Sequence, residues 1–124
     1  MEKRSQLFYK NGSEKLKKAN EELFRPEEDI VLYSVCKNSQ FAIESYLKGY
    51  LLENNIDILN LDTIDKLYKK CVSINDKFKK IDLSDITCKA HKIDTRYCTT
   101  SEKVSSCFDA ADSLDTLLRQ EKII

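Results

Sequence analysis

The sequence has 124 residues, enough for one domain with one hydrophobic core, and no repeat or linker divides residues 1–124. Its 21 basic and 21 acidic residues cancel, so the overall charge gives no strong signal for a protein that binds nucleic acid by neutralising phosphates. The start lacks the apolar run of a signal peptide, and no stretch approaches the roughly 20 apolar residues that span a bilayer, so we expect a cytoplasmic protein without a membrane segment.

The scarcity of turn residues favours helices. Only two glycines and one proline are present, whereas all-β folds need frequent turns. A first helix is predicted by residues that recur at steps of three and four along one face: Tyr9, Gly12, Leu16, Ala19 and Leu23. Asn11-Gly12 is a point at which this helix could break or begin, and Arg25-Pro26 is predicted to end it.

The strongest prediction is a long helix near residues 27–54. Its apolar stripe comprises Leu32, Val35, Cys36, Ser39, Ala42, Ile43, Tyr46, Leu47, Tyr50 and Leu51. Ile30, Phe41 and Leu52 form a second apolar face, which is either packing for the first helix or a dimer contact. A helix that is apolar on two sides is predicted to lie at the centre of its bundle or to form half of an interface.

Shorter helical segments follow. Asp62 or Thr63 is predicted to cap a helix whose inner face is Ile64, Leu67, Tyr68 and Cys71, and Ile74, Phe78 and Ile81 either continue it or form a second short turn. Ser84 is predicted to cap another helix, with Ile86, Ala90 and Ile93 inward. Thr99-x-x-Glu102 has the form of a capping box before a last helix with the stripe Val104, Cys107, Phe108, Ala111, Leu114, Leu117 and Leu118. The predicted fold is all-α, an up-and-down bundle of four to five helices.

Two segments resemble the HEPN family, the "higher eukaryotes and prokaryotes nucleotide-binding" domains. Residues 39–52 are similar to the second helix of that family: Ala42, Glu44, Leu47 and Lys48 match, while Gly49 replaces the usual alanine. Arg96-Tyr97-Cys98 resembles the Arg-Tyr-Pro that precedes the family's last long helix, with Cys98 in place of proline. The order, length and spacing of the helices agree over nearly the whole chain.

The resemblance implies a bundle that usually dimerises, with polar residues gathered where the subunits meet. Many relatives are metal-independent ribonucleases with an arginine followed, four to six residues later, by a histidine. Here the only histidine, His91, precedes Arg96 instead, and the general base of that motif is absent. Other branches accompany small nucleotidyltransferases in toxin–antitoxin systems, a role that needs no catalytic residue in this chain.

The residues that the resemblance nominates for nucleotide binding are Glu44, Lys48, Arg96 and Tyr97. A lysine supplies a point charge, an arginine a phosphate fork and a tyrosine a stacking surface. The structural alternative pairs Lys48 with Glu44, four residues earlier, and makes Arg96 a loop or helix-end anchor. The lysine-rich stretches 15–18 and 77–80 are further candidates for phosphate contacts, although acidic neighbours make a solvated face the better explanation.

Cys88, His91, Cys98 and Cys107 have the right atoms for zinc but not the paired spacing of known structural zinc sites, so neither a metal site nor a cofactor is predicted. The leading hypothesis is a homodimeric, non-catalytic HEPN-type module that binds a nucleotide or a nucleotidyltransferase partner. A divergent ribonuclease toxin is the alternative, and a purely structural interaction protein is the third.

Overall fold

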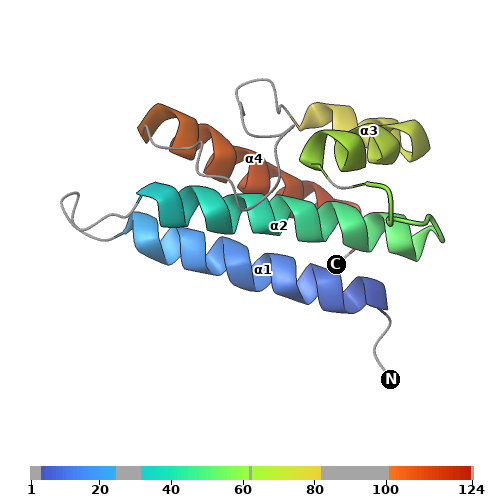
Figure 1. Cartoon of the computed structure of the whole chain (residues 1–124), viewed down its shortest axis with the longest axis horizontal. Coiled ribbons are helices and arrows are strands. Elements are labelled where there is room, and N and C mark those ends of the chain that lie inside the picture. Colours follow the sequence, from blue (N-terminus) through green and yellow to red (C-terminus); the bar gives the residue numbers. More distant parts are fainter. Residues whose placement is uncertain (1–3, 25–31, 62, 82–100, 124) are drawn as a thin grey trace.

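The computed structural model describes residues 4–24, 32–61, 63–81 and 101–123. These residues form four α-helices and one 3₁₀ helix, and they contain no strand: α1 (Arg4–Leu23), α2 (Leu32–Glu53), α3 (Ile64–Ile74), η2 (Asp76–Lys80) and α4 (Ser101–Gln120). Figure 1 shows α1 antiparallel to α2, with α3 and α4 on the other side of α2. The predicted all-α bundle is confirmed.

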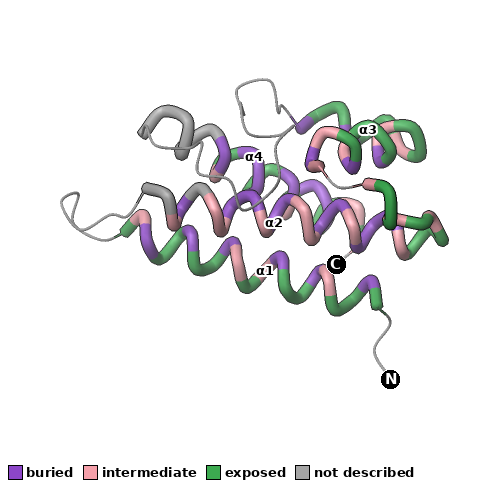
Figure 2. Tube along the Cα trace, in the orientation of Figure 1, coloured by how far each residue is buried: buried purple, intermediate pink, exposed green. Residues whose placement is uncertain are grey.

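Helix α2 is the centre of the bundle, because it packs against α1, α3 and α4. Its predicted stripe is buried wherever the side chains are described: Val35, Ser39, Ala42, Ile43, Tyr46, Leu47, Tyr50 and Leu51. Buried residues follow the inner sides of α1, α2 and α4 in Figure 2. The central position predicted for this helix is therefore confirmed over Leu32–Glu53, and the predicted start at residues 27–31 lies outside the described ranges.

Helix α1 buries the predicted face, with Tyr9, Leu16 and Ala19 in the core. It does not break at Asn11-Gly12, where the sequence suggested a break or a start. The reason is packing. A Cβ atom on Gly12 would lie 2.9 Å from the ring of Tyr46 on α2, so the glycine makes room for a tyrosine inside a continuous helix.

The same arrangement occurs a second time between these two helices. A Cβ atom on Gly49 of α2 would lie 2.8 Å from the ring of Tyr9 on α1. The hydroxyl group of Tyr9 then donates to Oε2 of Glu53 at 2.5 Å. Residues 9–12 and 46–49 are therefore two Tyr-x-x-Gly segments that pack on each other. The tyrosine ring of each lies against the glycine of the other, which brings α1 and α2 close together.

Thr63 caps α3 as predicted, because its Oγ1 accepts from the backbone N–H of Lys66 at 3.2 Å. Of the two alternatives for the following residues, a separate turn is correct: η2 buries Phe78, and Ile81 behind it is buried too, while Ile74 is partly exposed. The predicted helix after Ser84 and the capping Thr99 lie outside the described residues.

Helix α4 buries the predicted stripe from Cys107 to Leu118, with Phe108 half-buried. Among the residues that the structure describes, no helix is both long and apolar enough to span a membrane.

Candidate functional site

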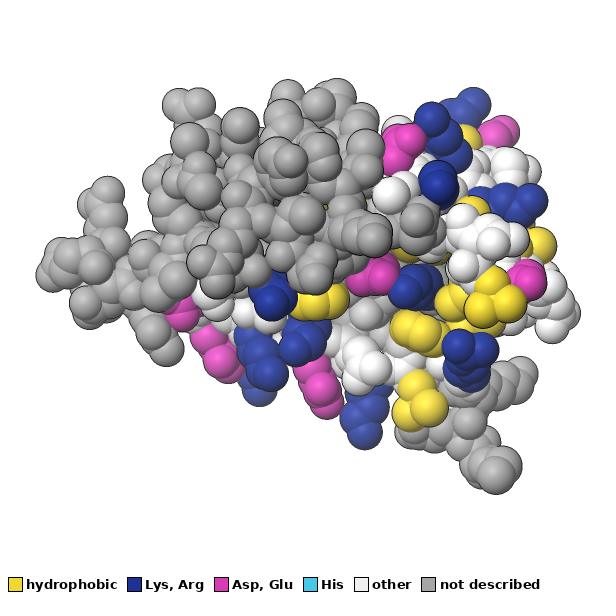
Figure 3. All heavy atoms as spheres, viewed as in Figure 1, with side chains coloured by type: hydrophobic (Ala, Val, Ile, Leu, Met, Phe, Trp, Pro, Cys, Tyr) yellow, Lys and Arg dark blue, Asp and Glu magenta, His cyan; other side chains and the backbone are white. Residues whose placement is uncertain are grey.

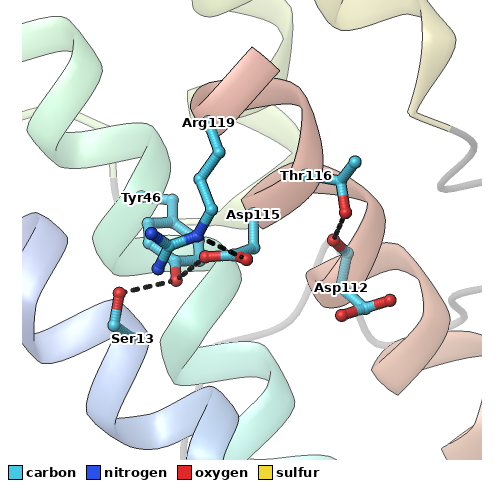
Figure 4. Close-up of polar contacts among 6 residues, drawn as sticks. All are labelled: Ser13, Tyr46, Asp112, Asp115, Thr116 and Arg119. Atoms are coloured by element: carbon cyan, nitrogen blue, oxygen red, sulfur yellow. Dashed lines mark hydrogen bonds and ion pairs between the residues drawn. The ribbon is translucent and has the colours of Figure 1, made fainter. Parts of the chain in front are cut away.

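Four polar side chains from α1, α2 and α4 meet at one point, shown in Figure 4. The hydroxyl group of Tyr46 donates to Oδ1 of Asp115 at 2.7 Å, and Nε of Arg119 donates to Oδ2 of the same carboxylate at 3.0 Å. The Oγ atom of Ser13 lies 3.0 Å from the Tyr46 hydroxyl oxygen. Because the single hydroxyl proton of Tyr46 is used by Asp115, Ser13 is the donor in this last bond.

The local sequence places each member of this network. Tyr46 lies on the buried stripe of α2 and is completely buried, so its hydroxyl group needs a partner inside the protein. Ser13 follows Gly12 directly, at the place where the Tyr46 ring packs on α1. Asp115 and Arg119 are four residues apart on α4 and therefore share one face of that helix.

Burial, together with the hydrogen bond to Asp115, raises the pKa of Tyr46 far above its ordinary value. The phenol is therefore a fixed hydrogen-bond donor at neutral pH and not a proton acceptor. Asp115 in turn accepts one bond on each oxygen, and its hydrogen bond with Arg119, together with its negative charge, raises the pKa of Arg119. The network is thus electrically neutral and holds the Arg119 side chain in one direction.

A cavity of about 300 Å³ lies beside this network, between α1 and α4. Its volume falls at the lower end of ordinary small-molecule sites, which run from about 300 to 1,000 Å³. The lining combines apolar, uncharged polar, basic and acidic side chains: Leu16 and Phe108; Ser13, Asn20 and Tyr46; Lys17 and Arg119; Asp112 and Asp115.

The two basic residues of the cavity come from opposite walls, Lys17 from α1 and Arg119 from α4. Figure 4 shows the terminal nitrogens of Arg119 directed toward the α1 side, while the carboxylate of Asp112 points away from Arg119. The lining offers a small ligand a guanidinium fork and an ammonium group, together with the apolar side chains of Phe108 and Leu16.

Glu44 and Lys48, nominated from the sequence, lie elsewhere. They form an ion pair of 2.5 Å with each other and do not line the cavity. Their side chains are 18% and 24% exposed, so the pair lies half-buried on α2. This arrangement is the structural alternative stated above for Lys48. Arg96 and Tyr97 lie outside the described residues, so only the Glu44–Lys48 part of the predicted set of four is described, and the set as a whole stays a prediction.

The second apolar face of α2 is partly covered from within the chain. Phe41 is half-buried, and Nζ of Lys15 on α1 lies 5.7 Å from the centre of its ring, with Nζ of Lys37 at 5.8 Å. Leu52 is also half-buried, and Ile30 lies outside the described ranges. For Phe41 the structure shows a contact with the first helix, and the dimer contact stays a prediction.

Of the cysteines and the histidine considered for zinc, only Cys107 lies within the described residues, and it is completely buried in the core stripe of α4. Cys71, also buried, donates from Sγ to the backbone oxygen of Leu47 at 3.7 Å. Burial raises the pKa of Cys71 to about 12, so this thiol stays protonated and unreactive. Within the part of the chain that the structure describes, no group of three or more His, Cys, Asp or Glu residues could hold a metal ion.

The sequence alone does not connect the residues that line the cavity. It marks Lys17 only as part of a lysine-rich stretch, and Tyr46 and Phe108 only as core residues. Two signals were present: a buried tyrosine needs a hydrogen-bond partner, and Asp115 and Arg119 have the i, i+4 spacing of a helical ion pair. Neither signal shows that the partner of Tyr46 lies on the last helix.

Comparison with known proteins adds no identification, because no known protein family, curated protein or solved structure matches this chain significantly.

Proposed function

We propose that this chain is a non-catalytic helical binding module that takes a nucleotide-class ligand in the cavity between α1 and α4. The observation that carries the proposal is the presence of Lys17 and Arg119 on opposite walls of a cavity that also has an aromatic and an aliphatic side. A phosphate group suits the two cations, and a base or sugar suits Phe108 and Leu16. The resemblance of residues 39–52 to the HEPN family supports the nucleotide class.

The charge of the lining favours a ligand with few negative charges. Lys17 and Arg119 are matched by Asp112 and Asp115, so the charges of the described lining residues cancel. A triphosphate would bring several charges close to two carboxylates, whereas a monophosphate needs only one strong contact. A nucleoside monophosphate is therefore the ligand we place in this site.

Binding is favoured over catalysis by the state of the cavity residues. Tyr46 is held protonated and so does not serve as a general base, and both oxygens of Asp115 already accept hydrogen bonds, from Tyr46 and Arg119. Among the described residues that line the cavity, there is no histidine or cysteine. The divergent ribonuclease alternative depends on His91 and Arg96, which lie outside the described residues.

Titration calorimetry with AMP, adenosine and ATP tests this proposal. We expect AMP to bind at least about tenfold more tightly than adenosine, because a hydrogen bond to a charged group contributes about 1.5–3 kcal/mol. We expect ATP to bind no more tightly than AMP. In Arg119→Gln the preference for AMP over adenosine should disappear.

Lys48→Gln is the matched control, since it removes a cation from the residue pair that the sequence nominated. We expect its affinity for AMP to equal that of the wild type. If Lys48→Gln loses binding while Arg119→Gln retains it, the ligand occupies the α2 surface instead. Absence of saturation by any of the three ligands at millimolar concentration would refute a nucleotide site altogether.

We also propose, on the family resemblance alone, that the protein is a homodimer and acts as the accessory subunit of a small nucleotidyltransferase. Phe41 and Leu52, both half-buried, are the residues to examine at the subunit contact. Sedimentation equilibrium separates the two states directly. A mass of 14.4 kDa at every concentration would exclude the homodimer. A chromosome with no nucleotidyltransferase gene beside this one would count against the accessory role.

A further inference from the structure

The surface of α3 and η2 carries a concentration of positive charge that the cavity does not explain. Residues 64–80 contain six lysines against two aspartates, although the whole chain is neutral. All six lysines are exposed: Lys66, Lys69, Lys70, Lys77, Lys79 and Lys80, called here the lysine patch. Figure 3 shows several basic side chains over the α3 end of the molecule, with a few acidic ones between them.

The backbone under the lysine patch is held in place by buried contacts. The hydroxyl group of Tyr68 on α3 donates to the backbone oxygens of Phe78 and Ile81, at 3.1 and 2.9 Å. The ring of Phe78 is buried and lies 4.7 Å from the ring of Tyr50 on α2. Asn75 caps η2 by accepting from the N–H of Lys77 at 3.0 Å. The backbone that carries the lysines is therefore held against the rest of the bundle.

The chain already places carboxylates on this surface. Lys69 pairs with Asp65 at 3.0 Å within α3, and Lys77 pairs with Glu121, which follows α4. Within the described ranges, no ion pair engages Lys70, Lys79 or Lys80. The second pair shows that a carboxylate from another element can reach the lysine patch, and these three lysines keep the same capacity for a carboxylate from elsewhere.

We propose that the lysine patch is a docking surface for an acidic segment of a partner protein. Three observations favour carboxylates over other polyanions. The patch has lysines but no arginine, so it lacks the fork that recognises phosphate bidentately. Its two aromatic rings are engaged, with Phe78 buried and the Tyr68 hydroxyl bonded, so no exposed ring is offered for base stacking. The apolar face of α3 is buried in the core at Ile64, Leu67 and Cys71, and the partly exposed Ile74 alone is too small an apolar surface for insertion into a lipid surface.

Fluorescence anisotropy with a labelled Glu-rich peptide, beside an oligothymidylate of equal net charge, tests the docking surface. The wild type should bind the peptide saturably and more tightly than the oligonucleotide, and the affinity should fall as NaCl is raised. Lys79→Glu/Lys80→Glu should weaken the affinity for the peptide by about tenfold or more, since like charges then face the partner. Lys70→Glu changes a lysine on α3 instead of η2, and it should weaken the same affinity independently.

Lys10→Glu/Lys18→Glu is the matched control, because it makes the same change of charge at exposed positions of α1. Circular dichroism confirms that each variant is folded. Equal weakening by the α1 control would show that only net charge matters, and tighter binding of the oligothymidylate would identify a nucleic-acid surface. The proposal would also be overturned if the peptide did not bind saturably. The same holds if the protein associated with itself in a salt-sensitive way and Lys79→Glu/Lys80→Glu removed that association. AMP binding in the cavity is unaffected by any of these outcomes, so the two proposals stand or fall separately.

Discussion

The hydroxyl group of Tyr46 joins three helices. It donates to Asp115 on α4 and accepts from Ser13 on α1, while its ring packs on Gly12. In Tyr46→Phe the ring remains and the hydroxyl group is lost, so the buried carboxylate oxygen loses a donor. We expect the free energy of unfolding to fall by about 1–2 kcal/mol in urea denaturation.

Thr116→Ala is a suitable control for that change. The hydroxyl group of Thr116 donates to the backbone oxygen of Asp112 at 3.0 Å, but at an exposed position of the same helix. Its loss should change stability by less than about 0.5 kcal/mol. Equal losses of stability in the two variants would show that the hydrogen bonds of Tyr46 stabilise the fold no more than an exposed hydrogen bond does.

Alkaline pH should destabilise the protein through three buried groups. Burial raises the pKa of the Cys71 thiol from 9.0 to about 12, and burial together with bonded carboxylates raises the pKa of Tyr9 and Tyr46. Above pH 9 the unfolded chain loses the thiol proton while the folded chain keeps it, and the tyrosines follow above about pH 10. The unfolded state then binds fewer protons, so stability present at neutral pH is lost as the pH rises.

Urea denaturation across pH 8–11 measures this effect. Relative to the wild type, Cys71→Ala should remove the part of the decline that begins near pH 9, which amounts to at most about 1.4 kcal/mol per pH unit. Tyr9→Phe should leave that part unchanged and reduce the decline above about pH 10. Identical pH profiles for the wild type and both variants would contradict the assignment to these groups.

Only pairs that are local in the sequence were predictable, and the site itself was not. The ion pair between Glu44 and Lys48 follows from helical spacing alone, and the structure contains it. The Tyr46–Asp115 bond joins residues 69 positions apart, so it depends on how α2 and α4 pack. The cavity depends on the same packing, which is why Lys17, Asn20 and Arg119 were not joined into one site.

At the scale of the helices, the two Tyr-x-x-Gly segments set the distance between α1 and α2. A methyl group on Gly12 would contact the Tyr46 ring at 2.9 Å and the backbone oxygen of Ala42 at 3.3 Å. The first contact is too short for the alanine to fit unless the Tyr46 ring or α1 moves, and the second is tighter than an ordinary van der Waals contact. An alanine there gains helix propensity but forces the two helices apart.

We therefore expect Gly12→Ala to destabilise the protein by about 1–3 kcal/mol despite its better propensity. Asn11→Ala, at the exposed neighbouring position, should be neutral or stabilising by a few tenths of a kcal/mol, roughly the propensity difference. Thermal denaturation of both variants measures the contrast. A Gly12→Ala variant at least as stable as the wild type would show that the close approach of α1 and α2 is not required.

The helices themselves were largely predictable, because amphipathic stripes are local patterns. The faces of α1, α2, α3 and α4 were identified from spacing alone, and the described side chains confirm them. Gly12 was misread as a possible break because its role depends on Tyr46, a residue on another helix. Spacing likewise left open whether Phe78 and Ile81 extend α3 or form a separate turn, since that choice depends on burial against α2.

At the scale of the whole molecule, α2 packs against the helices that carry both the cavity and the lysine patch. The cavity lies between α1 and α4, and the lysine patch lies on α3 and η2. A ligand that binds only the folded state stabilises it by mass action, by about 2.7 kcal/mol at a hundred times its dissociation constant. AMP should therefore raise the melting temperature of the wild type and of Lys79→Glu/Lys80→Glu equally, and should raise that of Arg119→Gln by clearly less.

The most direct test of the ligand site is a map of amide chemical shifts in ¹⁵N-labelled protein during titration with AMP. We expect saturable shifts to concentrate on two helices, at residues 13–20 of α1 and 108–119 of α4, with little change at Glu44 and Lys48. Shifts centred on Glu44 and Lys48, or shifts that are small and do not saturate, would contradict a ligand site between α1 and α4.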